Sequence, residues 1–310
     1  MSVIRQKISH KATLANTITD LLGIDKDAVY RRLRGDVHFS FTEMAIIAKR
    51  LGISLDKIAG LENFQSRPAQ MNISNQINPT AIDYEMFNGH VNLLKSIQDE
   101  PQTILMEASN IIPHYLYQDY EYITRYHMFR WNHAGIHGDV LPYHEIVIAD
   151  ELRELQIQNC KYARHIESTV YVWDNMIFQR LTTNIQYFAK VRLIKEDDVA
   201  MIKKDLMLFL DNLEKVATKG KHEDSGKKIS IFISDVTSDT NYSCLKTKDI
   251  HLTLLRAFIL NAVVTFDVEV YNCVCAWIQS LQRKSILISV SGEKARAMYF
   301  DKQREIVQTL

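Results

Sequence analysis

The segment from Lys26 to Gly35 gathers residue types that bind nucleic acid. It holds four Lys or Arg and one Asp, although the whole chain has no net charge. Arginine and lysine donate hydrogen bonds to the acceptor atoms of guanine in the major groove, and neighbouring cations neutralise phosphates. A helix that enters the groove contacts bases with its first turn and its outward face. The candidates for base contacts are Lys26, Asp27, Tyr30 and Arg31.

Phosphate contacts are expected from neighbouring residues. Arg34 is the first candidate, and Arg32 either contacts a phosphate or packs its aliphatic stem beside Leu33. Ser40 and Thr42 stand where a further helix is expected to begin. Because the free N–H groups and the dipole at a helix start attract anions, this point is also a candidate phosphate site. These residues complete the candidate DNA-binding set.

Apolar repeats predict the helices that position this set. A first helix is indicated by apolar residues four, seven and eight positions apart: Leu14, Ile18, Leu21 and Leu22. Gly23 interrupts the repeat, and Asp25 is placed to cap a second helix. Val29 and Leu33 form the apolar seam of that helix. Its charged side chains are therefore expected to project elsewhere.

The end of the second helix and the start of the third carry their own signals. Gly35 ends the second helix, and Ser40 with Glu43 forms a capping box. The third helix has a buried side made of Met44, Ile47, Ala48 and Leu51. Ser54 is expected to cap a last short helix over 55–59. Two short helices joined by a glycine turn, the second basic and exposed, are typical of a helix-turn-helix.

The same residues carry a resemblance to a known family. LLGIDKDAVYRRLRGDVHFSFTEMAIIAKRLGISLDKI resembles the DNA-binding domain of lambda-repressor-like bacterial regulators of the Cro/repressor and XRE type. Similar variants have LGIS-x-x-x-VYRRLRGE followed by a capped helix. The resemblance covers about residues 10–60, with departures at Thr19, where the motif usually has alanine, and at Leu33, one residue beyond the usual apolar position. It implies a transcription factor that binds double-stranded DNA at palindromic sites, usually as a homodimer.

Composition limits the class of protein. The 310 residues contain 37 Lys and Arg against 37 Asp and Glu, which excludes a protein that coats nucleic acid along its length. Ten glycines and five prolines are few and favour long helices over a turn-rich all-β fold. Four cysteines do not make a disulfide framework. With no signal-peptide pattern, and a longest apolar stretch (252–266) too short to span a bilayer, we expect a cytoplasmic protein without a membrane partner.

The positions of glycine and proline, together with the distribution of charge, predict that the chain has three parts. Residues 1–62 form the helix-turn-helix domain, 63–79 a polar linker rich in Asn and Gln, and 80–310 a regulatory and oligomerisation domain. The first part carries a net charge of +3 and the remaining 248 residues a net charge of −3. The neutral total is therefore the sum of a small basic domain and a mildly acidic one.

The third part is expected to be mixed α/β, which makes the whole chain helix-rich α+β. Helices are predicted over 80–98, 115–131, 143–166, 176–193, 196–217, 268–282 and 293–307. Strands are predicted over 103–107, 168–173, 229–233, 242–246 and 285–290. The third and fourth of these strands are expected to pair across a turn, and 252–266 is either a central strand or a buried helix.

No signature of an enzyme or of a cofactor site is present in this domain. The histidines His127, His133, His137 and His144, with Asp139, are interpreted as loop and surface residues rather than zinc ligands. Cys273 and Cys275 are expected to fill the core. The aromatic residues between 115 and 131 are interpreted as packing residues rather than the lining of a ligand pocket. No catalytic residue, metal or cofactor is therefore predicted.

Three hypotheses follow. The favoured one is a sequence-specific transcriptional regulator whose second domain dimerises the chain, with an unidentified small-molecule effector left open. The alternative is an enzyme or a protein-interaction module that carries an accessory helical domain. A third hypothesis is a purely oligomeric scaffold.

Overall fold

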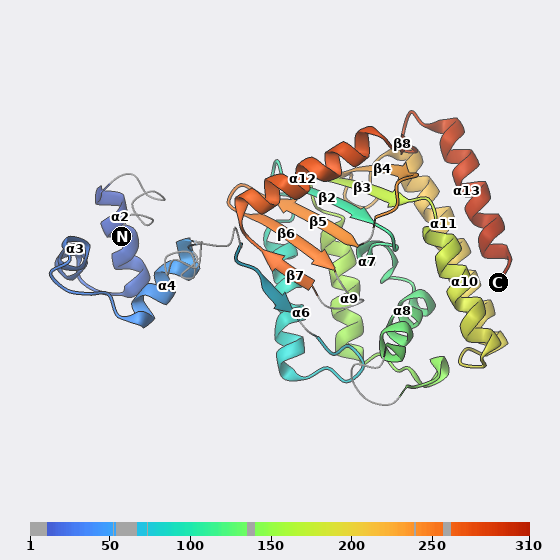
Figure 1. Ribbon diagram of the computed structural model, residues 1–310, viewed down its shortest axis with the longest axis horizontal. Helices are drawn as coiled ribbons and strands as arrows, with labels where there is room; N and C mark the ends of the chain where they lie inside the picture. Colours follow the sequence, from blue (N-terminus) through green and yellow to red (C-terminus); the bar gives the residue numbers. More distant parts are fainter. Residues whose placement is uncertain are drawn as a thin grey trace. The chain divides into compact units, whose positions relative to one another are not determined.

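The computed structural model describes residues 11–51, 53, 67–72, 74–134, 140–238, 240–256 and 262–310. The chain divides into two compact units, Met1–Pro68 and Ala69–Leu310. Helices make up the described part of the first unit, and an eight-stranded mixed sheet with helices makes up the second (Figure 1). The helix-rich mixed α/β class expected from the sequence is confirmed.

Three helices of the first unit are described: α2 (Lys11–Leu22), α3 (Lys26–Arg34) and α4 (Phe41–Leu51). Their apolar sides form one small core of Leu14, Ala15, Ile18, Val29, Leu33, Ile47, Ala48 and Ile53. Burying these side chains is what holds such short helices together, because helices of this length are marginal alone in water. The helix predicted over 55–59 and its cap Ser54 lie outside the described residues.

The sheet of the second unit has the strand order β1-β7-β6-β5-β2-β3-β4-β8. Strands β2, β3 and β4 are parallel neighbours, and the remaining pairings are antiparallel. The strands are β1 (Gln70–Asn72), β2 (Ile104–Ser109), β3 (Ser168–Asp174), β4 (Lys228–Ser234), β5 (Asn241–Lys246), β6 (His251–Arg256), β7 (Ala262–Thr265) and β8 (Ile286–Leu287). The carboxyl ends of the three parallel strands meet at one edge.

Helices cover both faces of this sheet. Met106, Ala108 and Val172 point to the face covered by α12 (Val268–Arg283), which packs along β2 to β6 (Figure 1). Leu105 and Tyr171 alternate to the other face. That face is covered by α6 (Ala81–Ser96), α7 (His114–Tyr117), α8 (Glu121–His133), η2 (Tyr143–Glu145), α9 (Asp150–Ala163), α10 (Ile177–Lys190), α11 (Glu196–Lys219) and α13 (Glu293–Gln308).

Strand pairing corrects two expectations. The predicted hairpin between 229–233 and 242–246 is wrong, because β4 and β5 are separated in the sheet by β3 and β2. The apolar stretch 252–266 is neither one strand nor a helix, since it contributes β6 and β7, which pair with each other in antiparallel fashion. The positions of β4 and β5 in the sheet depend on partners far along the chain, and in neither case does local periodicity reveal the pairing.

The segment expected to be a linker is partly ordered into the second unit. Gln70–Asn72 forms β1 and pairs with β7 at the edge of the sheet. The Asn75 side chain then accepts hydrogen bonds from the N–H groups of Ile77 and Asn78, and Asp83 accepts one from the N–H of Asn75. The polar composition therefore serves a hydrogen-bonded turn in the part of this segment that the structure describes.

Two long predicted helices are shorter than expected. The helix over 115–131 is divided into α7 and α8, because Arg153 of α9 donates to the carbonyl oxygens of Gln118 and Asp119. The helix over 143–166 begins only at Asp150, because Tyr143 is fully buried and its N–H donates to the carbonyl of Leu193. In the described ranges no helix is long and apolar enough to cross a membrane.

Candidate nucleic-acid interface

Residues at its two ends define where α3 begins and where it stops. Asp25 occupies the N-cap position with extended backbone, and its side chain makes no capping hydrogen bond. Gly35 ends the helix in the left-handed conformation at a φ of 92°. There the N–H of Gly35 donates to the carbonyl oxygen of Arg32, and the N–H of Asp36 donates to the carbonyl oxygen of Arg31. A glycine meets this conformational demand without strain, which explains the sequence signal at 35.

The two sides of α3 differ sharply in exposure. Val29 and Leu33 are buried, as the seam predicted. The exposed side carries the four candidate base-contacting residues and Arg34, namely Lys26, Asp27, Tyr30, Arg31 and Arg34. Their positions differ by one, four, five and eight, so they share one face of the helix. The structure therefore brings these five sequence candidates together on one accessible surface, the α3 outer face.

Arg32 does not belong to that face. Its Nε and terminal nitrogen donate to the two carboxylate oxygens of Glu43 at 3.2 and 2.9 Å. A further hydrogen bond of 3.3 Å runs to the carbonyl of Ala28. Both charged side chains are less than one fifth exposed. Arg32 thus fastens α3 to the start of α4, a role that the sequence analysis did not foresee for this candidate phosphate contact.

The predicted capping box at the start of α4 is present. The Ser40 hydroxyl accepts from the N–H of Glu43 at 3.2 Å, and the N–H of Ser40 donates to the Glu43 carboxylate at 2.8 Å. The Ser40 amide and the nearby Arg32 guanidinium lower the pKa of Glu43. The chain's own carboxylate therefore occupies part of the helix start proposed for a phosphate. Thr42, in the first turn of α4, is exposed.

Arg34 is paired, but only at the surface. Its guanidinium donates to the Asp36 carboxylate at 2.9 Å, and the two side chains are 62% and 50% exposed. Such a solvent-exposed pair contributes little free energy, so either partner can be exchanged at small cost. Arg34 is thus free to turn to a phosphate, unlike Arg32.

In the second unit the structure corrects the interpretation of two of the histidines, whereas His144 is exposed as expected. His127 and His133 lie on α8 rather than in a loop, and the ring of His127 stacks on Tyr117 with 4.1 Å between centroids. His133 packs edge-on against Phe188. His137 and Asp139 lie outside the described residues. Among the residues that are described, no three His, Cys, Asp or Glu side chains are grouped as metal ligands would be.

The cysteine and aromatic expectations have mixed outcomes. Cys275 is half-buried and lies against the Met106 sulfur, but Cys273 is exposed, so the core role expected for Cys273 is wrong. On a helix, side chains two positions apart point in different directions, so only one of the two cysteines can face the sheet.

The packing interpretation of the aromatic run is confirmed for its five buried members: Tyr115, Tyr117, Tyr126, Phe129 and Trp131.

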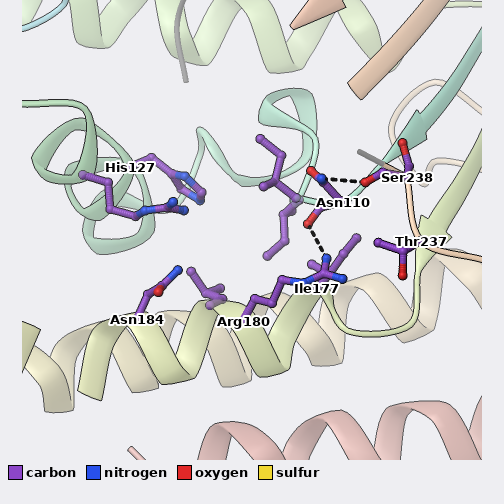
Figure 2. Close-up of a pocket in the computed structure, with 11 residues that line it drawn as sticks. Asn110, His127, Ile177, Arg180, Asn184, Thr237 and Ser238 are labelled. Atoms are coloured by element: carbon purple, nitrogen blue, oxygen red, sulfur yellow. Dashed lines mark hydrogen bonds between the residues drawn. The ribbon is translucent and has the colours of Figure 1, made fainter. Parts of the chain in front are cut away.

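Sequence reasoning missed a second set of polar residues. They line a pocket of about 410 Å³ in the second unit, where Arg130 of α8 and Arg180 of α10 are the cationic members (Figure 2). Its residues come from four separate stretches of the chain, so no spacing motif marks them. Only the known preference of ligands for the carboxyl edge of parallel strands would have indicated this place.

The α3 outer face is an exposed, basic helix surface, whereas the second set of residues lines a pocket. Comparison of the chain with models of protein families, with curated proteins and with solved structures finds no match.

Proposed function

We propose that this protein is a sequence-specific DNA-binding transcriptional regulator and that α3 enters the major groove. The observation that carries the proposal is the arrangement of α3. Its apolar seam packs into the core of the unit, Arg32 pairs with Glu43 of α4, and the basic α3 outer face is left to solvent. Lys26, Asp27, Tyr30 and Arg31 would contact base edges, and Arg34 a phosphate.

The glycine turn at Gly23 supports this assignment. Gly23 adopts a φ of 62°, and its N–H donates to the carbonyl of Thr19 at the end of α2. The short connection lets α2 cross the DNA backbone while α3 occupies the groove, as in other helix-turn-helix domains. Arg32 then acts as a positioning residue, because it holds the rotation of α3 relative to α4.

The proposal extends to a homodimer on a palindromic operator. Each protomer would place one α3 in the groove, with half-sites about one helical turn apart. The second unit would supply dimerisation, and such a regulator acts in the cytoplasm. An effector would change DNA affinity only if it binds the competent and incompetent arrangements unequally.

Selection of DNA sites in vitro with the full chain tests the proposal. We expect enrichment of a sequence with two symmetric halves, and binding that weakens as salt rises. Absence of any enriched sequence would reject the function. A single unpaired half-site would retain DNA binding but reject the dimer.

A matched pair of variants distinguishes the effect of where a lysine lies from the effect of the net charge of the chain. Lys26→Ala removes one cation from the α3 outer face, and Lys302→Ala removes one from the exposed surface of α13. Both change the net charge equally, but only the first should reduce affinity for the selected site. Equal losses would mean that the chain binds DNA through its overall charge.

A further inference from the structure

The pocket of the second unit lies where the three parallel strands end. Asn110 directly follows β2, Ile177 follows β3 at the start of α10, and Thr237 and Ser238 follow β4. Ligands of open α/β sheets bind at this edge, because the loops that leave the strands diverge there. The volume of about 410 Å³ is that of a small-molecule site.

The polar side chains around the pocket converge from several elements. Figure 2 shows His127 and Asn110 on one side and Arg180 and Asn184 of α10 on the other. The amide of Asn110 donates to the Ser238 carbonyl at 2.8 Å, which ties the loop after β2 to the loop after β4. The walls are thus held by contacts between segments more than a hundred residues apart.

Arg180 is held in position before any ligand arrives. Its guanidinium donates to the Asp174 carboxylate at 2.7 Å, and the Asp174 side chain is only 1% exposed. A second, longer contact of 3.5 Å runs to the Asn110 carbonyl. The carboxylate and the Asn110 carbonyl accept from different terminal nitrogens, so together the two contacts limit how the guanidinium can turn. The remaining donors can then serve another acceptor.

Arg130 differs from Arg180 in having no such partner. Within the described ranges its side chain makes no hydrogen bond or ion pair. No acidic residue is among the eleven that line the pocket. The Asp174 carboxylate offsets the charge of Arg180, whereas the half-buried Arg130 guanidinium has no acidic partner among the described residues, so the hollow keeps a positive potential. An anion would neutralise it.

His127 adds a neutral polar group to the same wall. Burial, and then the charge of Arg130, lower the pKa of His127 to about 3. Its Nε2 atom is buried and has no hydrogen-bond partner. An uncharged imidazole here can donate to or accept from a ligand without adding a third charge. Ile112, Ile177 and Leu181 supply an apolar wall beside these groups.

We propose that this pocket binds a small organic oxyanion, with its carboxylate or phosphate group between Arg130 and Arg180. The apolar part of the molecule would lie against Ile112, Ile177 and Leu181, and the side chains of Asn110 and Asn184 would bond its polar substituents. The site lies wholly within the second unit, so it stands independently of DNA binding by α3. In the regulator proposed above, this pocket would be the binding site of a small-molecule effector.

Calorimetric titration of the full chain with simple probes tests the site. Phenyl phosphate and benzoate carry the two anionic groups on one apolar body, and benzyl alcohol is their neutral control. At constant ionic strength we expect saturable millimolar or tighter binding of at least one anion, and none of the alcohol. The tighter anion identifies the class of the natural ligand. Failure of both anions to saturate the protein would overturn the proposal.

Variants locate the binding. Arg130→Gln removes a cation without stranding a partner and should weaken the tighter anion about tenfold or more. Arg180→Lys keeps the charge and the Asp174 contact but loses the planar fork, so a smaller loss is expected. Arg283→Gln, on the exposed surface of α12, is the matched control and should bind normally. Equal affinity in Arg130→Gln and Arg283→Gln would reject this location for the anion.

Discussion

The two units treat their charged side chains in opposite ways. Between residues 14 and 48 no charged side chain is fully buried, and even the Arg32–Glu43 pair keeps nearly a fifth of its surface. The second unit buries Asp83, Glu107 and Asp174. Exposed cations can meet a polyanion without losing much solvation, whereas buried groups need partners inside the protein. The described part of the first unit therefore presents its charged side chains to solvent, whereas the second unit encloses several of them.

The buried groups of the second unit include a cluster on the face of the sheet opposite α12. Glu107 of β2 is 2% exposed, and burial raises its pKa. Arg256 at the end of β6 contacts the ring of His114, which lies 3.9 Å from the ring of Tyr115. Burial also lowers the pKa of His114 well below its ordinary value. Such groups make the stability of this unit depend on pH.

The largest expected effect is therefore a loss of stability of the second unit as pH falls from 6.5 towards 4. Burial lowers the pKa of His90 and His222 to about 4, and that of His127 to about 3. An unfolded chain takes up these protons below about pH 6.5, and the folded unit does not. Each histidine thus reduces the free energy of unfolding by about 1.4 kcal/mol per pH unit as pH falls from 6.5 towards 4. Glu107 opposes this, because its pKa is raised.

Tryptophan fluorescence during urea unfolding checks this effect. All three tryptophans, Trp131, Trp173 and Trp277, lie in the second unit, so their signal reports on it alone. The urea concentration at the unfolding midpoint should decrease as pH is lowered from 7 to 5. In His222→Gln this dependence of the midpoint on pH should be weaker. His38→Gln, an exposed site in the first unit, should leave this dependence unchanged. A midpoint independent of pH would contradict the contrast between the units.

The next effect concerns the surface of the first unit. Arg31→Ala should reduce affinity for the selected DNA site by about 1–3 kcal/mol and relax the preference at one base position, if the guanidinium contacts a base. Arg34→Gln should instead weaken binding to all DNA sequences evenly. It should also lower the slope of log affinity against log salt concentration by about one. Competition binding with single-base variants of the site distinguishes them. An unchanged preference in Arg31→Ala would remove it from the base-contacting set.

A third effect tests the largely buried ion pair between Arg32 and Glu43. Glu43→Gln removes the charge that Arg32 and the Ser40 amide share, and should cost about 1–2 kcal/mol in stability. Hydrogen exchange measured by mass spectrometry on peptides from α3 and α4 would show the loss. Glu85→Gln, on the exposed surface of α6, is the control and should change nothing. Unaltered exchange in Glu43→Gln would mean that the apolar core alone holds α3.

The smallest effect compares two glycines. Gly35 has a φ of 92°, so Gly35→Ala should destabilise the end of α3 by about 1 kcal/mol. Gly89 lies inside α6, where an added Cβ would meet no atom within 4 Å. Gly89→Ala should therefore stabilise the second unit by up to about 1 kcal/mol. Thermal unfolding of both variants gives the two signs, and destabilisation by Gly89→Ala would contradict the helical propensity argument.

Local features of the fold were predictable because their causes lie within a few residues. The seam of Val29 and Leu33, the left-handed Gly35 and the Ser40–Glu43 box each depend on neighbours along the chain. Their types and spacing therefore carry enough information. The boundaries of α8 and α9 were less predictable, because Arg153 and the buried Tyr143 act on distant backbone groups.

Local sequence patterns were enough to place the three described helices of the first unit and the face of α3 that carries its cations. Only the tertiary structure decided that Arg32 pairs with Glu43, that 70–72 joins the sheet through β7, and that Arg130 and Arg180 line one pocket. The physical reason is the range of the interactions. Helix periodicity and caps act within one or two turns, whereas strand order and convergent side chains depend on which distant segments pack together.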